Sequence, residues 1–488
     1  MPSQVISTLS LGCILGAGSS RYQTVRHKGE GVSRLPQSDV QARARARAAW
    51  YAVFVLTVCY TFSFVDRLIL AFLVTPLKHD LHLSDTQVGL LQGLAFAMLY
   101  AVLGIPFGLA ADRVNRRNLI VAGVIAWSLM TSLGSIARTF GTLALARMGV
   151  GIGEAALSPA AFSMIADHFP RERLSSAMSF YSMGVQLGAG LALLVGGLVV
   201  QAVMHMSPVT LPLLGTLEPW RLTFLIVGAP GILVVALLAT VREPARRALP
   251  DASAVAPTVP GLANAIRQIR LRWGSSIGIS LTMSCQAMGN YAFGSWAPAF
   301  FERVHQWPKS RAGWVLGTIT MGCGCIGLVC GGRLSDRWLR MGRAEAPLRV
   351  GLVSLLGSSV TLVPAMLSPS QSVTVALLVP AVFFLALPIG CSYAAIQMIF
   401  PNEVRATVSA LMLLLLNVIG LSLGTLLPGL LDDRLFHDEQ MLGVSVGITA
   451  GLASLTGSIA ALLTFAPFRR DFGAARASVT PLSSAVQT

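Results

Sequence analysis

Four ionisable residues stand inside otherwise apolar stretches of the sequence: Asp66, Arg67, Arg147 and Glu154. Carboxylates and guanidinium groups pair with one another, exchange protons, or bind the ionic group of a ligand. Arg147 and Glu154 are seven residues apart, so a helix places them on one face. Two acids and two bases have no net charge together. The pattern predicts one layer of two acid–base pairs, suited to proton transfer or to a charged ligand.

The segments that hold these charges are long and apolar enough to cross a membrane. Of 488 residues, 54% are hydrophobic and 12% are charged, whereas soluble domains carry about 25% charged residues. This composition argues against a soluble enzyme, a disordered tail and a disulfide scaffold. A spanning helix needs about 20 mostly apolar residues. The expected spans are 49–77, 85–111, 118–137, 140–167, 174–204, 220–241, 273–300, 311–332, 348–368, 372–399, 404–431 and 441–466.

The buried charges fall at similar depths. At 1.5 Å per helical residue, Asp66 lies about 16 Å from the outer end of its span, and Arg147 and Glu154 about 10 and 21 Å inside theirs. Each charge costs at least about 2.5–3.5 kcal/mol at the bilayer centre. We therefore expect that these four residues are present because they have a function. Structural pairing of the first and fourth spans is the alternative.

The basic residues predict the orientation of the chain. With both termini in the cytoplasm, 27 of the 36 Lys and Arg residues lie inside, seven lie outside, and two, Arg67 and Arg147, lie within spans. Positive charge favours the cytoplasmic side, so the net charge of +15 needs no nucleic acid to explain it. We expect a monomeric multi-pass protein of the cell membrane, specifically a bacterial inner membrane, whose partners are the bilayer and a small-molecule substrate.

Two motifs recur in the second half of the chain. Gly108-x-x-x-Asp112-Arg113 returns at Gly332 with an offset of 224, and Phe169-Pro-x-Glu returns at Phe400 with an offset of 231. The repeat predicts an all-α membrane protein with twelve helices in two six-helix halves, and a substrate site between the halves. The expected parts are a disordered cytoplasmic N-terminus (1–48), two bundles (49–241 and 273–466), a cytoplasmic linker (242–272) and a tail (467–488).

The repeated loops place charges where helices meet the cytoplasm. An Arg–carboxylate pair at that level is partly desolvated, so it can latch neighbouring helices in one state. The alternative is that these charges only end helices and orient loops. The residues expected to form this cytoplasmic gate are Gly108, Asp112, Arg113, Arg116, Arg117, Asp167, Gly332, Asp336, Arg337 and Arg340.

These motifs resemble the major facilitator superfamily across residues 48–470. Arg147-Met-Gly149-Val-Gly151 is similar to its fourth-helix motif, although Asn115 and Ala189 replace a customary Gly and Pro. Asp66-Arg67, the run from Arg147 to Ser158, and Trp296-Ala-Pro298 resemble the spinster-like transporters. The resemblance implies alternating access and lysolipid or sphingoid-type substrates.

The internal repeat offers a control for the charged site. Asp66 and Arg67 map onto Asn290 and Tyr291, and the fourth-span pair maps onto leucines. The fold therefore does not require the charges, and we expect a cavity with one charged wall and one neutral wall. Such a cavity suits a ligand with an ionic head and an apolar body. Weaker candidates for its lining are Gln286, Asn290, Tyr291, Trp296, Tyr393 and Gln397.

Motifs for enzymatic chemistry are missing from the sequence. Gly322-x-Gly324-x-x-Gly327 lies inside an apolar span without a preceding strand, so helix packing explains it better than a dinucleotide. Cys323-x-Cys325 lacks the spacing of a metal site, and no metal or cofactor is expected beyond the proton as coupling ion.

The sequence therefore predicts proton-coupled secondary transport of an amphipathic or anionic organic molecule. Arg67 or Arg147 would receive the anionic or zwitterionic head of the substrate when its carboxylate partner is protonated. Protonation of Glu154 would release Arg147, and Asp66 is the alternative proton carrier. An organic-acid or sugar-acid symporter is a rival within transport. A membrane sensor that does not transport is a rival from another class.

Overall fold

The structure is a computed structural model that describes residues 37–111, 113–169, 171–211, 215–244, 261–389 and 391–477. The chain separates into two compact parts, residues 1–49 and 50–488, each described by itself. In the first part, residues from Gln37 onward are helical. Within the second part, residues 50–241 are called the first half and residues 273–477 the second half.

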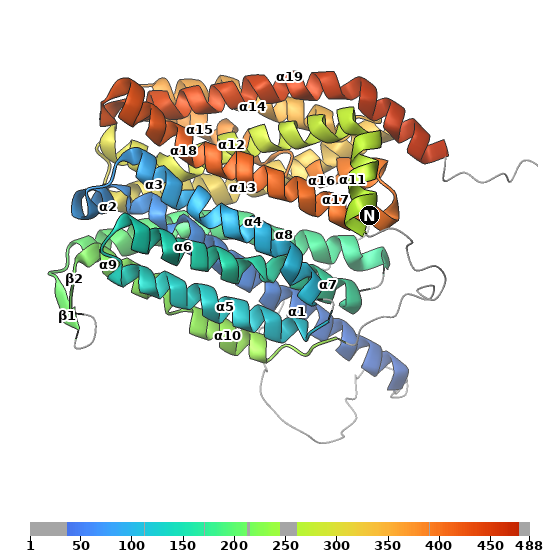
Figure 1. Ribbon diagram of the computed structural model, residues 1–488, viewed down its shortest axis with the longest axis horizontal. Helices are drawn as coiled ribbons and strands as arrows, with labels where there is room; N and C mark the ends of the chain where they lie inside the picture. The colour runs from blue at the N-terminus through green and yellow to red at the C-terminus, as the bar shows by residue number, and fades with distance from the viewer. Residues whose placement is uncertain are drawn as a thin grey trace, which may run out of the picture. The chain divides into compact units, whose positions relative to one another are not determined.

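The described elements are almost entirely helical (Figure 1). Up to residue 244 they are α1 (Gln37–Leu68), η1 (Ile69–Phe72), α2 (Val74–Leu81), α3 (Asp85–Gln92), α4 (Leu94–Ala111), α5 (Arg116–Leu133), η2 (Gly134–Ile136), α6 (Phe140–Ala155), α7 (Leu157–His168), α8 (Arg171–Met204), β1 (Val209–Leu211), β2 (Gly215–Leu217), α9 (Pro219–Gly228) and α10 (Gly231–Ala239). From residue 261 they are α11 (Gly261–Leu271), α12 (Trp273–Arg303), α13 (Lys309–Arg340), α14 (Ala346–Leu367), α15 (Gln371–Ala386), α16 (Ser392–Ile399), α17 (Asn402–Leu415), η3 (Leu416–Leu421), α18 (Ser422–Leu431), η4 (Asp432–Phe436), η5 (Glu439–Met441) and α19 (Leu442–Ala477).

Ten helical segments of the described chain are long and apolar enough to cross a membrane. The two other expected spans fall on α12 and α15. α12 has 31 residues, but serines, threonines and amides dilute its apolar character. α15 has only 16 residues and ends shortly before Pro388, which has no N–H to continue the helix.

Several expected spans are broken in the middle. In the first span, α1 ends at Leu68, and a 3₁₀ turn connects it to α2. The second span is broken at Gly93, between α3 and α4. The fourth span is broken at Ala156, because the ring of Pro159 clashes with the carbonyl four residues earlier. The breaks at Leu68 and Ala156 lie within two residues of Arg67 and Glu154.

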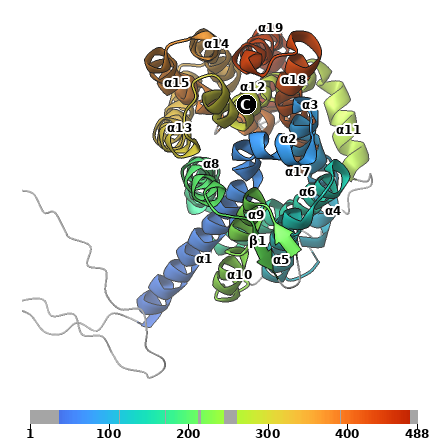
Figure 2. The same cartoon turned by 90° about the vertical axis from the view of Figure 1, so that its left-hand side faces the viewer.

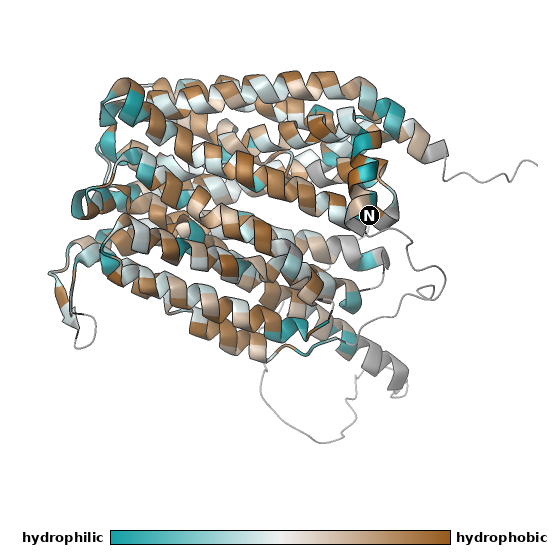
Figure 3. Cartoon of the chain, in the orientation of Figure 1, coloured by the Kyte–Doolittle hydropathy of each residue, from teal (hydrophilic) through white to brown (hydrophobic). Residues whose placement is uncertain are grey.

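The helices of the second part share one general direction, and α11 crosses it (Figure 1). α8 of the first half packs along α13 of the second half, and α12 packs along α19 (Figure 2). Hydrophilic residues gather near the helix ends, and apolar residues cover the helices between them (Figure 3). Exposed Ile232, Leu233 and Leu463 are examples of side chains on the outer surface that suit contact with lipid.

Three expectations about the connecting segments need correction. Residues 37–48 are helical rather than disordered, because α1 begins at Gln37. The expected linker contains α11, and the expected tail is helical to Ala477. A short antiparallel hairpin, β1 with β2, occupies a loop for which no strand was expected. Residues 1–36, 245–260 and 478–488 of these predicted segments lie outside the described residues.

Candidate functional site

A buried ion pair joins α1 to α6 at the centre of the first half. Arg67 Nη2 lies 2.5 Å from Glu154 Oε2, and Ser63 Oγ donates a hydrogen bond of 2.9 Å to the same oxygen. Ser63 stands one helical turn before Arg67, so both reach Glu154 from one face of α1. The side chains of Arg67 and Glu154 are nearly inaccessible to solvent, so the pair is held in a low-dielectric environment.

The second predicted base, Arg147, binds backbone rather than a carboxylate. Its guanidinium donates to the carbonyl oxygens of Asp66, at 3.3 Å, and Arg67, at 3.1 Å. α1 ends at Leu68, and the last four carbonyls of a helix lack partners within it. Arg147 therefore satisfies two of these carbonyls and the partial negative charge at the helix end. Of the two acid–base pairs expected from the sequence, the structure contains one, Arg67 with Glu154. Arg147 caps the end of α1 instead of pairing with a carboxylate.

Asp66 has a different environment from Glu154. Its side chain is fully buried, and neither carboxylate oxygen has a hydrogen-bond partner among the described residues. The groups that act on it are the charges of Glu154 and Arg147 and the hydroxyl of Thr131. The four predicted residues thus lie together, but the two carboxyl groups are in unequal surroundings.

An aromatic box surrounds the Arg67 guanidinium. Its carbon lies 4.7 Å from the ring centre of Phe64, 4.3 Å from that of Phe96 and 5.1 Å from that of Tyr100. Such a contact contributes about 0.5–1 kcal/mol at an exposed site and about 2 kcal/mol when the cation is desolvated. Phe96 and Tyr100 are four residues apart on α4, a spacing that places two rings on one helix face. The sequence analysis missed this box because a helical aromatic pair is commonplace in a membrane span.

Glycines on α6, the helix that carries Arg147 and Glu154, allow it to pack closely against its neighbours in the first half. A Cβ on Gly151 would lie 2.5 Å from the Phe96 carbonyl oxygen, and one on Gly153 would lie 2.6 Å from the Trp127 nitrogen. The backbone of α6 therefore touches α4 and α5 directly. This close packing brings Arg147 and Glu154 within reach of α1.

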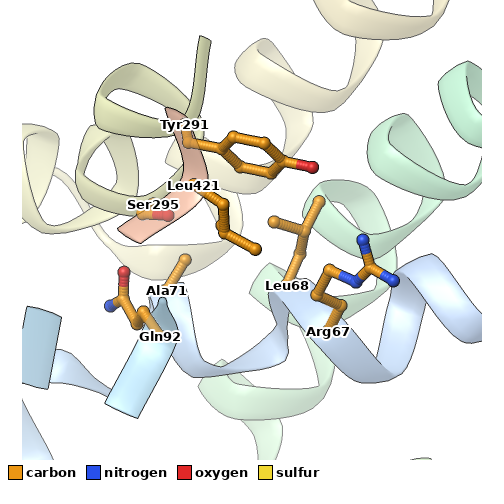
Figure 4. Close-up of a pocket in the computed structure, with 7 residues that line it drawn as sticks. All are labelled: Arg67, Leu68, Ala71, Gln92, Tyr291, Ser295 and Leu421. Atoms are coloured by element: carbon orange, nitrogen blue, oxygen red, sulfur yellow. The ribbon is translucent and has the colours of Figure 1, made fainter. Parts of the chain in front are cut away.

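Arg67 also lines a pocket between the two halves (Figure 4). The pocket has a volume of about 10 Å³, room for roughly one water. Arg67 is the one charged residue of its lining, and Tyr291 reaches it from α12 in the second half. The lining residues are Arg67, Leu68, Ala71, Gln92, Tyr291, Ser295 and Leu421.

Of the six weaker candidates, the structure places Tyr291 in this pocket. Gln286 donates to Ser354 at 2.5 Å, and Trp296 donates to the Thr425 carbonyl at 2.9 Å, so both pack helices together. Asn290 is half-buried and outside the lining, and Gln397 is exposed. Tyr393 belongs to α16, but its side chain lies outside the described residues.

At the end of the helices that holds the predicted gate, Arg116 is the central residue. It pairs with Asp167 and with Glu243, whose oxygen lies 2.7 Å away. The Arg117 backbone N–H donates to the other Glu243 oxygen at 3.0 Å. Arg116, Arg117 and Asp167 were predicted for this gate together with Asp112 and Arg113. Arg113 is exposed, and Asp112 lies outside the described residues.

The copy of the gate motif in the second half is not paired in the same way. Asp336, Arg337 and Arg340 are exposed on α13. Gly108 and Gly332 are half-buried, and Gly332 has no atom within 4 Å of the position of a Cβ. Among the residues that the structure describes, the region of the repeated motif therefore forms an ion-paired cluster in the first half and not in the second.

The opposite end of the helices carries a network that the sequence analysis missed, called here the Asp85 network. Arg303 donates to both carboxylate oxygens of Asp85, at 2.8 and 3.0 Å. Lys78 lies 2.8 Å from Asp85 and 2.5 Å from Glu439. Asp433 accepts from the backbone N–H groups of Asp85 and Thr86. Within the described chain, the ion pairs that join the two halves lie at this end.

The family model of the Major Facilitator Superfamily matches residues 56–425, three quarters of the chain. The chain belongs to the Major Facilitator Superfamily. Its fold is therefore that of a multi-pass membrane transporter with twelve helices in two six-helix repeats, and it is not an enzyme.

Curated relatives cover nearly the whole chain. An MFS-type efflux pump of Mycolicibacterium smegmatis is 35% identical over 89% of this chain and 96% of its own length. Protein spinster homolog 1 of Mus musculus is 28% identical over 86% of this chain and 81% of its own. The resemblance to spinster proteins expected from the helix motifs is confirmed.

Solved structures agree with the fold. A bacterial homolog of the human lysosomal transporter Spinster, in an inward-facing and unoccupied conformation, has a TM-score of 0.69 and 28% identity over 88% of this chain and 97% of its own. A D-xylose–proton symporter has a TM-score of 0.62 and 17% identity over 84% of this chain and 97% of its own, a likeness of fold alone.

Proposed function

We propose that this transporter moves an organic anion with an apolar body together with a proton. The observation that carries the proposal is the buried Arg67–Glu154 pair, of which Arg67 also lines the pocket between the halves. An anionic head group and Glu154 would compete for one guanidinium. A proton on Glu154 ends that competition in favour of the substrate.

Charge balance favours movement of proton and anion in the same direction. The empty site contains Arg67⁺ and Glu154⁻, and the loaded site would contain Arg67⁺, the substrate anion and neutral Glu154. Both states have no net charge at this pair. A site loaded with only the proton or only the anion keeps an uncompensated buried charge, which costs several kcal/mol. The half-loaded states are therefore poorly suited to crossing between orientations.

Of the two arginines, the geometry favours Arg67 as the one that meets the substrate. The sequence analysis assigned the released base to Arg147, but that guanidinium caps α1. Protonation of Glu154 frees Arg67 instead. In this proposal, Arg147 holds the end of α1 in position through its two backbone hydrogen bonds. The position of α1 in turn keeps Arg67 in the pocket.

Asp66 is the second titratable group of the proposal. An ionised carboxylate there would be fully buried beside the carboxylate of Glu154, an arrangement that is costly. We therefore assign the neutral form to Asp66 and the ionised form to Glu154 in this conformation.

We place the Asp85 network on the outer side of a cell membrane, a bacterial inner membrane, with both termini in the cytoplasm. The distribution of basic residues supports this orientation. In it, the ion pairs between the halves close the outer side, and rocking of the halves alternates access. A monomer suffices, because one chain supplies both walls of the pocket. Spinster relatives, among them a sphingosine-1-phosphate transporter of Xenopus tropicalis, support a lysolipid-like or sphingoid-like amphiphile.

The test is uptake of a labelled lysophosphatidylglycerol, a lysolipid with a single negative charge, into proteoliposomes with an imposed pH gradient. Glu154→Gln imitates the protonated acid, so the anion still binds but uptake no longer responds to the gradient. We expect the ratio of uptake with and without the gradient to fall to about 1. Glu302→Gln removes a carboxylate of a distant ion pair with Lys309 and should behave as wild type. Gradient-driven uptake in Glu154→Gln contradicts the coupling role, and absence of uptake by the wild type favours a sensor.

A further inference from the structure

Gln92 is a buried amide without a partner. Its side chain is 5% exposed, and neither the amide oxygen nor the amide nitrogen bonds to a described residue. Buried polar groups in proteins nearly always have partners, because an unpaired amide has lost its hydrogen bonds to water. Gln92 also lines the pocket that contains Arg67. Its unused donor and acceptor therefore lie beside the proposed substrate site.

The backbone around Gln92 is fixed by close helix contacts. α3 ends at Gln92, and Gly93 leaves the helical conformation with φ −111° and ψ −85°. A Cβ on Gly89 would lie 2.5 Å from the Thr425 carbonyl oxygen, and one on Gly93 would overlap the Thr425 hydroxyl. These contacts press α3 against α18 of the second half. Gln92 thus lies on the surface that separates when the halves rock apart at the Asp85 network.

The pocket has a charged side and an uncharged polar side. Figure 4 shows Arg67 on one side, Gln92 with Ser295 on the other, and Leu68, Ala71 and Leu421 between them. Ser295 adds a hydroxyl to the uncharged side. No carboxylate and no second cation belong to the described lining. A second charged group on the ligand would consequently find no counter-charge there.

We infer that Gln92 selects substrates that carry, besides the anion bound by Arg67, an uncharged hydrogen-bonding group such as a hydroxyl or an amide. This inference rests on the proposed function and narrows it. The selected ligand is a monoanionic amphiphile with a neutral polar group separated from the anion by an apolar segment. Zwitterions and dianions are disfavoured, since their second charge would be desolvated without a partner.

The experiment uses three series of probes with 6 to about 12 carbons: unsubstituted fatty acids, ω-hydroxy acids and ω-amino acids. Equilibrium binding to the full chain in lipid nanodiscs is measured by competition, with empty nanodiscs subtracted. One additional hydrogen bond to a neutral partner increases the affinity by up to about tenfold. At the chain length that reaches from Arg67 to Gln92, we expect the hydroxy acid to bind about 3- to 10-fold more tightly than the fatty acid. The amino acid should bind more weakly than both.

Gln92→Leu keeps the size of the side chain and removes the amide. We expect it to abolish the hydroxyl preference, to leave fatty-acid affinity within about twofold, and to keep or raise the melting temperature, because an unpaired buried amide disappears. Arg67→Gln should weaken all three series together. A hydroxyl preference that survives in Gln92→Leu, or its absence at every length in the wild type, overturns the inference.

The two proposals fail in different ways. If the wild type binds none of the acids, the anion site at Arg67 is wrong, and the selection by Gln92 falls with it. If the acids bind and depend on Arg67 but not on Gln92, only the present inference is wrong. A lower melting temperature with an intact hydroxyl preference would make Gln92 a structural residue.

Discussion

At the scale of single residues, the charged site was only partly predictable. Counting along the helices gave the depth of Asp66, Arg147 and Glu154, and the structure brings these residues together with Arg67. The partners were not predictable, because depth says nothing about rotation around a helix axis. Nor does a sequence show that α1 ends at Leu68, and it is this helix end that draws Arg147 away from Glu154.

A second residue-scale feature, at Glu345, predicts a pH dependence of stability. Glu345 precedes α14 and accepts hydrogen bonds from Arg469 at 2.6 Å and Arg349 at 2.8 Å. The bond from Arg469, helped by Arg349, lowers the pKa of the Glu345 carboxyl from 4.5 to about 2. A lowered pKa in the folded state stabilises the protein above the unfolded pKa, and this contribution is lost as the pH falls toward 2.

Glu345→Gln should therefore lower the melting temperature most above pH 5. The difference from the wild type should shrink between pH 4.5 and 2, where the wild-type carboxyl becomes protonated. Thermal unfolding of both purified proteins across this pH range measures the difference in melting temperature. A difference that is the same at pH 6 and pH 2.5 would show that the charge of Glu345 does not stabilise the fold.

At the scale of helices, the spans were predictable and their breaks were not. Apolar length and the internal repeat sufficed for twelve spans, because the bilayer imposes that length. Pro159 in the sequence indicates the break near Ala156. The breaks at Leu68 and Gly93 depend on contacts with other helices, which the sequence does not show. Helices α3 and α18 touch through glycines, and such contacts join residues more than 300 positions apart.

Gly89→Ala tests whether the contact between α3 and α18 holds the Asp85 end closed. The added methyl would meet the Thr425 carbonyl oxygen at 2.5 Å, so the helices must separate. We expect faster modification of a cysteine at position 295 by an impermeant thiol reagent added outside. Gly104→Ala is the matched control, because no atom lies within 4 Å of its added methyl. Equal labelling of the two variants would argue against a gate at this contact.

At the scale of the whole molecule, the proposed closure of one side of the transporter rests on the Asp85 network. Two cations from different halves share the buried carboxylate of Asp85, and Asp433 binds the start of α3 from the second half. Ion pairs between the halves at the Arg116 end are lacking among the described residues. The sequence analysis placed its gate at the Arg116 end because the repeated motif lies there, whereas the residues of the Asp85 network belong to no repeat.

Asp85→Asn should shift the whole molecule toward an orientation open at the Asp85 end. Removal of one partner from a buried ion pair costs about 3–5 kcal/mol, and 1.4 kcal/mol already changes a population ratio about tenfold. In a chain whose seven native cysteines are replaced, a cysteine at position 295 should be labelled from outside at least about ten times faster. Transport should slow at the same time, because the cycle needs the closed outer side as well as the open one. Glu302→Gln, which breaks an ion pair within the second half at the same end, should leave labelling unchanged. Slower transport without faster labelling would mean that Asp85 stabilises the fold without controlling access.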